Sequence, residues 1–361
     1  GYDRYNTDME KQSTIRRIWR ECFPEDSEEW TDMYFRRTYS DESALTLEVA
    51  DETVSSLLLQ PYAMTFHGHT VAAGYISGAA TRRKARGHGY MHTLMNEALR
   101  LSYSRGDMLC TLIPAHAWLS DFYARFGFST VFYRKIERYT AGHAFLLSDC
   151  FHAVETTDPG DLYADFCRLS DLRDCHICQT FDQFVTIMED NRMSDGIFRA
   201  VRHSDGTTAG MAWAVPESDS DTIRITELLY DSSDAREAVL HEIRCALPDR
   251  PITVWAQPPD ERTGNMLGHG MARIVNVNQA LSIISATHHD LNLSVRVTDQ
   301  VIPQNCGTFH LHDGMLETGS DHTPDLDLTV DVLTSLLFSS HRIGDIMGIP
   351  SVRPAMTLML D

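Results

Sequence analysis

The turn at residues 86 to 91, which read Arg-Gly-His-Gly-Tyr-Met, constrains the fold of this chain more than any other segment. It joins a strand-like run at 72–81 to a helix-like run at 90–101. Glycines at a strand-to-helix turn let the backbone approach an anion, and the helix N-terminus beyond them offers unpaired N–H groups and a partial positive charge. Arg86 adds a full charge. The pattern therefore predicts a turn that binds a pyrophosphate.

Three alternatives compete with this prediction. A dinucleotide-binding turn needs a third glycine and an acid about 20 residues on that closes the second strand. The third glycine is absent here, and Asp107 opens the next apolar run instead of closing it. A nucleoside-triphosphate loop needs Gly-Lys followed by Ser or Thr, which the chain lacks. The last alternative is a basic turn at 82–86 that merely solvates the start of a helix.

A second motif, Asp-Phe-Tyr-Ala-Arg-Phe-Gly-Phe, lies at residues 121–128 and follows a strand-like run at 108–113. Gly127 suits the left-handed cap at which such a helix ends. The two motifs together resemble the GNAT acetyltransferase superfamily, whose coenzyme A loop reads Gln/Arg-x-x-Gly-x-Gly/Ala and whose later helix ends in Tyr-x-x-Phe/Tyr-Gly-Phe/Tyr. Met91 departs from the loop motif at its last position. As an alternative, Tyr123 is a packed aromatic residue on a buried helix face.

The resemblance implies acetyl-CoA as co-substrate, with its pyrophosphate on the glycine turn and its pantetheine arm along the splayed strand before it. Acetyl transfer to an amine needs a neutral amine, a stabilised oxyanion and a proton for the departing thiolate, without a covalent intermediate on the protein. In the family the tyrosine lies near the thioester sulfur, which makes Tyr123 the general acid. The cofactor-binding residues implied are Ala79, Ala80, Thr81, Arg86, Gly87, His88, Gly89, Tyr90, Met91 and His92.

Length and composition set the context for these motifs. The 361 residues exceed one acetyltransferase domain of roughly 150 residues, so two or three domains are expected. No apolar run approaches a membrane span and no signal peptide precedes the first helix, which predicts no membrane association. The eight cysteines are scattered and do not form a disulfide framework, which favours a cytoplasmic location.

A net charge of −20 makes nucleic acid an unsuitable partner, because phosphate backbones reward clustered Lys and Arg. An acidic surface concentrates amines instead. The alternative is that the charge only maintains solubility.

The first domain is predicted to span residues 1–138. A helix starts near residues 7–10, and a second one follows Ser27, its expected N-cap. A meander follows, with strands at 44–49, 53–60 and 69–79. In the superfamily the opening helices border the acceptor pocket, which makes candidates of Asp26, Glu28 and Trp30; the alternative is a solvated face.

The second domain, 139–285, repeats this architecture faintly. Residues 198–201 and 209–215 form a predicted hairpin, and a strand at 223–230, a helix at 234–246 and a strand at 252–257 follow. The glycine loop is missing, and Asp231 and Asp234 stand where the pyrophosphate would lie. Carboxylates repel an anion, so a degenerate acetyltransferase-like domain without its own coenzyme is expected.

The third domain, 286–361, has predicted strands at 291–297 and 307–311 and a helix around 333–338. Residues 297–305 resemble a region of sterol-carrier-like domains. The three-part order resembles the enhanced-intracellular-survival family of N-acetyltransferases, and it implies an α+β (mixed α/β) fold of two tandem GNAT-like domains and a sterol-carrier-like domain. That family acetylates amines, forms trimers or hexamers, and uses its terminal carboxylate as a base, which here falls on Asp361, although family tails usually end in an aromatic residue.

No metal is expected. Cys175 and Cys178 have metal-ligand spacing but no partner pair, and His241-Glu242 lacks the second histidine of a metalloprotease helix. The sequence thus predicts an acetyl-CoA-dependent N-acetyltransferase that acts on a small-molecule or peptide amine. The alternative is a coenzyme-sensing or apolar-ligand carrier protein without turnover, and the retention of Arg86 and Tyr123 favours the enzyme.

Overall fold

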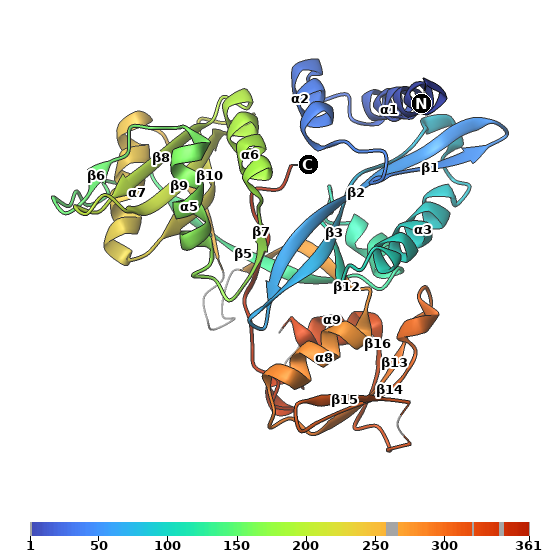
Figure 1. Ribbon diagram of the computed structural model, residues 1–361. Coiled ribbons are helices and arrows are strands. Elements are labelled where there is room, and N and C mark those ends of the chain that lie inside the picture. The colour runs from blue at the N-terminus through green and yellow to red at the C-terminus, as the bar shows by residue number, and fades with distance from the viewer. Residues whose placement is uncertain (1, 258–265, 320, 339–342, 361) are drawn as a thin grey trace. The chain divides into compact units, whose positions relative to one another are not determined.

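The computed structural model describes residues 2–257, 266–319, 321–338 and 343–360. The chain divides into two compact units, and Figure 1 labels their helices and strands. The first unit consists of the residues up to 131 together with 269–352, and the second of 132–268 together with 353–360. The domain limits predicted at residues 138 and 285 divide the sequence into continuous segments, whereas these units are discontinuous. Those limits remain a prediction.

Two helices open the first unit, α1 (Tyr2–Cys22) and α2 (Glu28–Thr38). The Ser27 side chain accepts a hydrogen bond from the Trp30 N–H at 3.1 Å, which confirms the predicted N-cap of α2. The start predicted for α1 near residues 7–10 was too late, because the helix begins at Tyr2.

The first unit contains a sheet in the order β1-β2-β3-β4-β12. These strands span Ala44–Val49, Glu52–Phe66, His69–Thr81, Leu109–Leu112 and Met266–Ile274. β1, β2 and β3 form the predicted antiparallel meander, and β3 continues through α3 (Tyr90–Ser104) into the parallel strand β4. The apolar face of α3 packs on the sheet, with Leu94, Met95, Ala98 and Leu99 in one buried cluster with residues of β2 and β4.

In the second unit, hydrogen-bonded strands follow one another in the order β5-β11-β10-β9-β8-β6. The strands span Ser129–Tyr139, Ile252–Ala256, Ile223–Tyr230, Thr208–Pro216, Ile197–Arg202 and His152–Ala153. The helices are α5 (Pro159–Ser170), α6 (Phe181–Met193) and α7 (Ser233–Ala246). A short parallel pair joins β7 (Cys175–Cys178) to β17 (Pro354–Ala355).

The two units repeat one pattern, which agrees with the tandem architecture expected from the sequence. In each, an antiparallel pair (β2-β3, β9-β10) leads through a helix into a parallel strand, β4 or β11. The register of each antiparallel pair also shifts once.

In each unit a strand from a distant part of the sequence pairs with the parallel strand. β4 pairs antiparallel with β12, and β11 pairs antiparallel with β5. The chain therefore leaves the first unit at residue 131 and returns to it at 269.

The region after β12 belongs to the first unit and forms a second, four-stranded sheet in the order β15-β14-β13-β16. Its strands span Met315–Thr318, Gly307–His312, Leu293–Thr298 and Leu326–Thr329. Helices α8 (Val277–Thr287), α9 (Val330–Leu337) and α10 (Ile343–Ile346) belong to the same region. The predicted strands and helix of this region are therefore present. Across the described ranges, every helix is too short or too polar to cross a membrane.

Candidate functional site

A bulge bends β3 at Gly78 and Ala79. Ser56 of β2 lies opposite Ala80 and Leu58 opposite Ser77, so two residues of β3 face one residue of β2. Gly78 has φ +61°, and a Cβ there would lie 2.3 Å from the Trp19 ring. Only glycine fits both the backbone conformation and the close approach of this ring.

β3 and β4 stop pairing just before the bulge. Their register ends at Ile76 and Leu112, whereas β3 continues to Thr81. Ala79 and Thr81 are half-buried and Ala80 is buried. Backbone groups of these last residues on the β4 side are therefore not used in pairing with β4 within the described chain.

The glycine turn follows directly. Gly87 and Gly89 have φ +84° and +74°, and Gly89 is the N-cap of α3 without a side-chain cap. A Cβ added to either glycine would meet nothing within 4 Å among the described residues, so the backbone conformation, and not crowding, requires glycine here. The N-terminus of α3 therefore presents backbone N–H groups to open space.

Arg86 lies at the start of this turn with its side chain exposed. Its Nε donates to the Thr81 carbonyl at 3.1 Å, and its Nη2 lies 3.7 Å from the Cys22 Sγ. No carboxylate pairs with Arg86 in the part of the chain that the structure describes. Its charge is thus held beside the end of β3 and remains available to an anion.

Two of its basic neighbours, Arg82 and Lys84, are already paired with carboxylates. Arg82 forms ion pairs with Glu21, at 3.3 Å, and with Glu52, and Lys84 lies 2.7 Å from Glu52. Glu21 also accepts a hydrogen bond from the Arg83 N–H at 2.8 Å, which lowers the pKa of its carboxyl. The motif analysis missed Glu21 and Glu52, because they come from other elements and carry no local signal.

The other residues of the turn pack among themselves and on the core. His88 Nδ1 lies 3.1 Å from the Ala85 carbonyl, and its ring stacks on Tyr90 with centroids 5.4 Å apart. Met91 is half-buried against the core cluster, which explains how a long residue is accommodated where the motif has a small one. His92 is exposed, and its ring lies 4.9 Å from that of Phe126.

Tyr123 lies on the short helix α4 (Leu119–Ala124) and is half-buried. Its ring contacts those of Phe122 and Phe128, with centroids 5.2 and 6.3 Å apart. Burial raises the pKa of the phenol, so the hydroxyl keeps its proton at neutral pH. The hydroxyl forms no hydrogen bond with any residue of the described ranges.

One aromatic chain connects Tyr123 to the glycine turn. The ring centroids of Phe122 and Phe126 lie 5.3 Å apart, and the Phe126 ring contacts that of His92 in the first turn of α3. Ala79, Met91 and Tyr123 also pack on the same buried cluster. The structure thus brings the strand end, the turn and the tyrosine together on one hydrophobic core.

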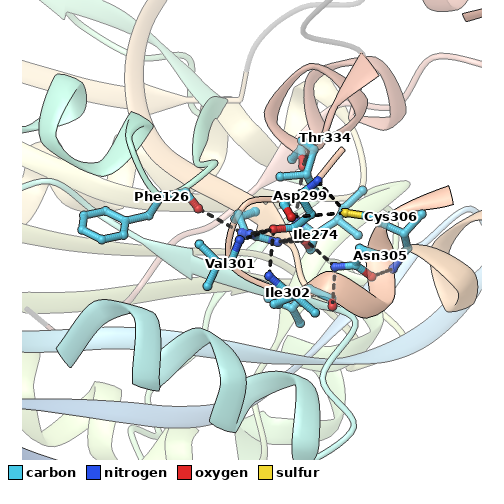
Figure 2. A network of polar contacts seen from close by, with 12 residues as sticks. Phe126, Ile274, Asp299, Val301, Ile302, Asn305, Cys306 and Thr334 are labelled. Atoms are coloured by element: carbon cyan, nitrogen blue, oxygen red, sulfur yellow. Dashed lines mark hydrogen bonds and ion pairs between the residues drawn. The ribbon is translucent and has the colours of Figure 1, made fainter. Parts of the chain in front are cut away.

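A buried arginine anchors the segment after Tyr123 through the polar network in which Figure 2 labels Phe126 and Asp299. Arg273 of β12 donates from Nε to the Phe126 carbonyl at 3.0 Å and from Nη1 and Nη2 to Asp299 at 2.7 and 2.6 Å. Gly127 has φ +88°, as its predicted role as a cap requires, and a Cβ there would lie 2.9 Å from Val330.

Asp299 is held from several sides. It accepts hydrogen bonds from the N–H groups of Val301 and Ile302 and from the Asn305 amide, at 2.9, 3.0 and 2.8 Å. Burial opposes its charge, but the bonds from Arg273 and Asn305 outweigh burial and lower the pKa of the carboxyl. Residues 297–305, which resemble a region of sterol-carrier-like domains, therefore hold the segment after Tyr123 in place through Asp299 and Arg273.

Two of the opening-helix candidates, Asp26 and Trp30, contact an aromatic cluster, whereas Glu28 forms an exposed ion pair. Trp19 Nε1 donates to Asp26 at 2.8 Å, Trp30 stacks on Tyr34 at 5.1 Å, and Glu28 pairs with Arg20 at 2.8 Å.

Tyr34 and Ser77, which the sequence analysis did not single out, share a hydrogen bond of 2.6 Å. Ser77 precedes the bulge, so this bond fixes α2 against the strand end.

The corresponding turn in the second unit is closed. Ser232 caps α7 by accepting from the Ala235 N–H at 3.1 Å, and Asp231 lies 2.7 Å from His203. Asp234 occupies the first turn of the helix. In the second unit a side-chain cap and carboxylates therefore occupy the N-terminus of α7, whereas the N-terminus of α3 after Gly89 has no side-chain cap.

The predicted base, Asp361, lies outside the described residues. The tail before it is ordered on the second unit, where Pro354 and Ala355 pair with β7 and Leu360 is buried. Thr357 bonds Glu227, which also forms an ion pair of 2.6 Å with Arg173.

Comparison with known families agrees with this architecture. Residues 4–131 match the acetyltransferase (GNAT) domain, and residues 277–352 match the sterol carrier protein domain. The expectation of a GNAT domain with a C-terminal sterol-carrier-like domain is confirmed. The GNAT match supports acyl transfer in general and leaves the acceptor open. Comparison with curated proteins finds no match.

Several solved structures share the fold over nearly the whole chain. Eis1 from Mycobacterium abscessus is 16% identical, with a TM-score of 0.73 and coverage of 98% of this chain and 96% of that one. A probable N-acyltransferase from Enterococcus faecalis is 14% identical, with a TM-score of 0.78 and 96% coverage of both chains. A GCN5-related N-acetyltransferase from Anabaena variabilis is 15% identical, with a TM-score of 0.77 and coverage of 96% and 97%. At these identities the likeness shows the fold: a mixed α/β chain with tandem GNAT-like parts and a sterol-carrier-like domain.

Proposed function

We propose that the first unit transfers the acetyl group of acetyl-CoA directly to an amine. The observation that carries the proposal is the combination, on one core, of a strand end unpaired with β4, an uncapped helix N-terminus behind two left-handed glycines, and a half-buried tyrosine.

The coenzyme pyrophosphate would lie on the turn from Arg86 to His92. Backbone N–H groups at the N-terminus of α3 and the helix dipole favour an anion there, and no carboxylate of the described residues neutralises Arg86. The pantetheine arm would pair with Ala79, Ala80 and Thr81, whose N–H groups also polarise the acetyl carbonyl.

Tyr123 would protonate the departing thiolate. A thiol has a pKa of about 8.5 and a phenol of about 10, so the proton moves toward sulfur only where the thiolate is desolvated and held close. Burial at Tyr123 keeps the phenol protonated until that step. The resulting tyrosinate regains its proton from solvent.

The amine must be neutral before it attacks. The terminal carboxylate of Asp361 is proposed as the base, by resemblance to the enhanced-intracellular-survival family. The acceptor is proposed to be a small-molecule or peptide amine, which the net charge of −20 attracts. By the same resemblance the chain acts as a trimer or hexamer. Its scattered cysteines favour a cytoplasmic location.

The test is a screen for acceptors. Polyamines, aminoglycosides and lysine peptides are incubated with the full chain and acetyl-CoA, and the release of free thiol is followed. Thiol release that depends on one acceptor class, with mass spectrometry showing an acetylated amine, supports the proposal. Coenzyme binding without turnover on any class would favour the carrier or sensor alternative.

A further inference from the structure

Histidine and carboxylate side chains gather on the four-stranded sheet of the first unit. β14 and β15 are antiparallel and place His310 directly opposite Glu317. His322 comes from the connection between β15 and β16, and its ring lies 4.4 Å from that of His310. The ligand atoms of these three residues all lie within 4.8 Å of one another.

The hydrogen bond between His310 and Asn292 leaves the other ring nitrogen of His310 free to bind a metal ion. Its Nε2 lies 2.8 Å from the Asn292 side-chain oxygen, which only accepts, so Nε2 carries the hydrogen. Nδ1 therefore bears the lone pair. This atom is buried and has no hydrogen-bond partner in the described ranges, and Glu317 at 3.8 Å is too far to donate or accept. Buried polar atoms normally have a binding partner, and a bound metal ion would supply one for this nitrogen.

We propose that His310 Nδ1, the Glu317 carboxylate and a ring nitrogen of His322 bind one divalent transition-metal ion of the zinc class. Two imidazoles and a carboxylate are the ligands of open zinc sites, and a set of nitrogen and oxygen without thiolate suits zinc better than calcium or magnesium. The hydrogen bond from His310 to Asn292 is the outer contact that orients a metal-binding histidine.

The geometry needs only side-chain movement. Bonds of 2.0–2.1 Å to a tetrahedral ion place ligand atoms about 3.4 Å apart. Glu317 is 55% exposed and can rotate to close the gap. His312 Nε2 lies 3.5 Å from Glu317, so the fourth position is open to this ring or to water.

The bound ion would join β14, β15 and the connection to β16. No sequence motif predicts the site, because its ligands are not closely spaced in the sequence. They are brought together by the pairing of β14 with β15 and by the connection from β15 to β16. The site departs from the sequence expectation that the chain holds no metal.

The test uses the full chain after removal of metals with a chelator. Zn²⁺ is titrated by calorimetry, and Co²⁺ is titrated with its visible absorption as readout. We expect one tight site per chain with the spectrum of tetrahedral nitrogen and oxygen ligands. His310→Ala and His322→Ala should each lower the affinity at least tenfold.

His203→Asn is the matched control, because His203 also lies beside a carboxylate, Asp231 at 2.7 Å, but belongs to no group of three potential metal ligands among the described residues. It should bind as the wild type does. Because His310→Ala could disturb the sheet, thermal melting is measured for each metal-free variant, and Zn²⁺ should raise the melting temperature of the wild type but not of His322→Ala.

Unchanged affinity in both histidine variants overturns the proposal. So does loss of the site in His203→Asn, or a Co²⁺ spectrum dominated by thiolate charge transfer, which would place the ion on cysteines.

Discussion

Arg273 and Asp299 form a doubly hydrogen-bonded ion pair, with N–O distances of 2.7 and 2.6 Å and side chains that are 1% and 0% exposed. The same guanidinium donates to the Phe126 carbonyl, three residues after Tyr123. The position of the tyrosine segment therefore depends on a residue of β12 and on a carboxylate of the sterol-carrier-like region.

The first prediction follows from this burial. Arg273→Leu leaves the Asp299 charge without its partner and should lower the free energy of unfolding of the first unit by about 3–5 kcal/mol. Denaturant titration measures the loss. As a control, Arg296→Leu removes an exposed pair with Asp327 and should cost less than about 1 kcal/mol. Equal small losses in both variants would contradict the prediction.

The same pair predicts a pH dependence. Because folding lowers the pKa of Asp299, its contribution is complete above the unfolded pKa of about 3.9 and is lost as pH falls toward the folded value. The stability difference between wild type and Asp299→Asn should thus be largest near neutral pH and shrink below about pH 4. A stability difference between wild type and Asp299→Asn that stays constant down to pH 3 would contradict this prediction.

The second prediction concerns the turn. Arg86→Glu, or Gly89→Val, which forces a β-branched residue into φ +74°, should weaken acetyl-CoA binding at least about tenfold, as the loss of roughly 1.5–3 kcal/mol implies. Calorimetry measures the affinity. Arg100→Glu, an exposed arginine of the same helix α3, is the control. Wild-type affinity in both turn variants would move the coenzyme elsewhere.

The third prediction tests the general acid. Tyr123→Phe keeps the ring on the core and removes the proton, so kcat should fall by about 10² to 10⁴ while coenzyme affinity barely moves. Tyr103→Phe alters another tyrosine that packs on the same cluster and should keep full turnover. Near-normal turnover in Tyr123→Phe would make its hydroxyl dispensable.

Local patterns predicted much of this fold. The strand at 223–230 matches β10 at both ends, and Ser27 caps α2 as expected, because periodicity and capping act over a few residues. The strand ending at Gln60 was too short: β2 continues through Pro61 to Phe66.

Long-range features did not follow from the sequence. The pairing of β4 with β12 and the ion pair between Arg273 and Asp299 join distant segments, and no local pattern encodes such partners. In the candidate site the glycine turn and Tyr123 were predicted from motifs, whereas Glu21 and Ser77 belong to no motif and were not predicted. Their positions depend on how α1 and β3 pack, which periodicity leaves undetermined.

The fourth prediction is one coenzyme per chain. In the second unit Ser232 closes the N-terminus of α7, and Asp231 and Asp234 add negative charge where a phosphate would have to lie. Calorimetric titration with acetyl-CoA should therefore give a stoichiometry of one. The Arg86→Glu variant should weaken binding at this site, and a stoichiometry of two in the wild type would contradict the prediction of a degenerate second domain.

The last prediction tests the proposed base at the end of the chain. A carboxylate near the amine would remove its proton once the site excludes water, so deleting the last four residues should abolish turnover and leave coenzyme binding intact. The deletion also removes Leu360, which is buried, and packing loss alone could lower activity. Leu360→Ala separates the two causes, because it weakens packing and keeps the terminal carboxylate. Turnover retained in Leu360→Ala and lost in the deletion assigns the effect to the carboxylate, whereas full turnover in the deletion variant would place the base elsewhere.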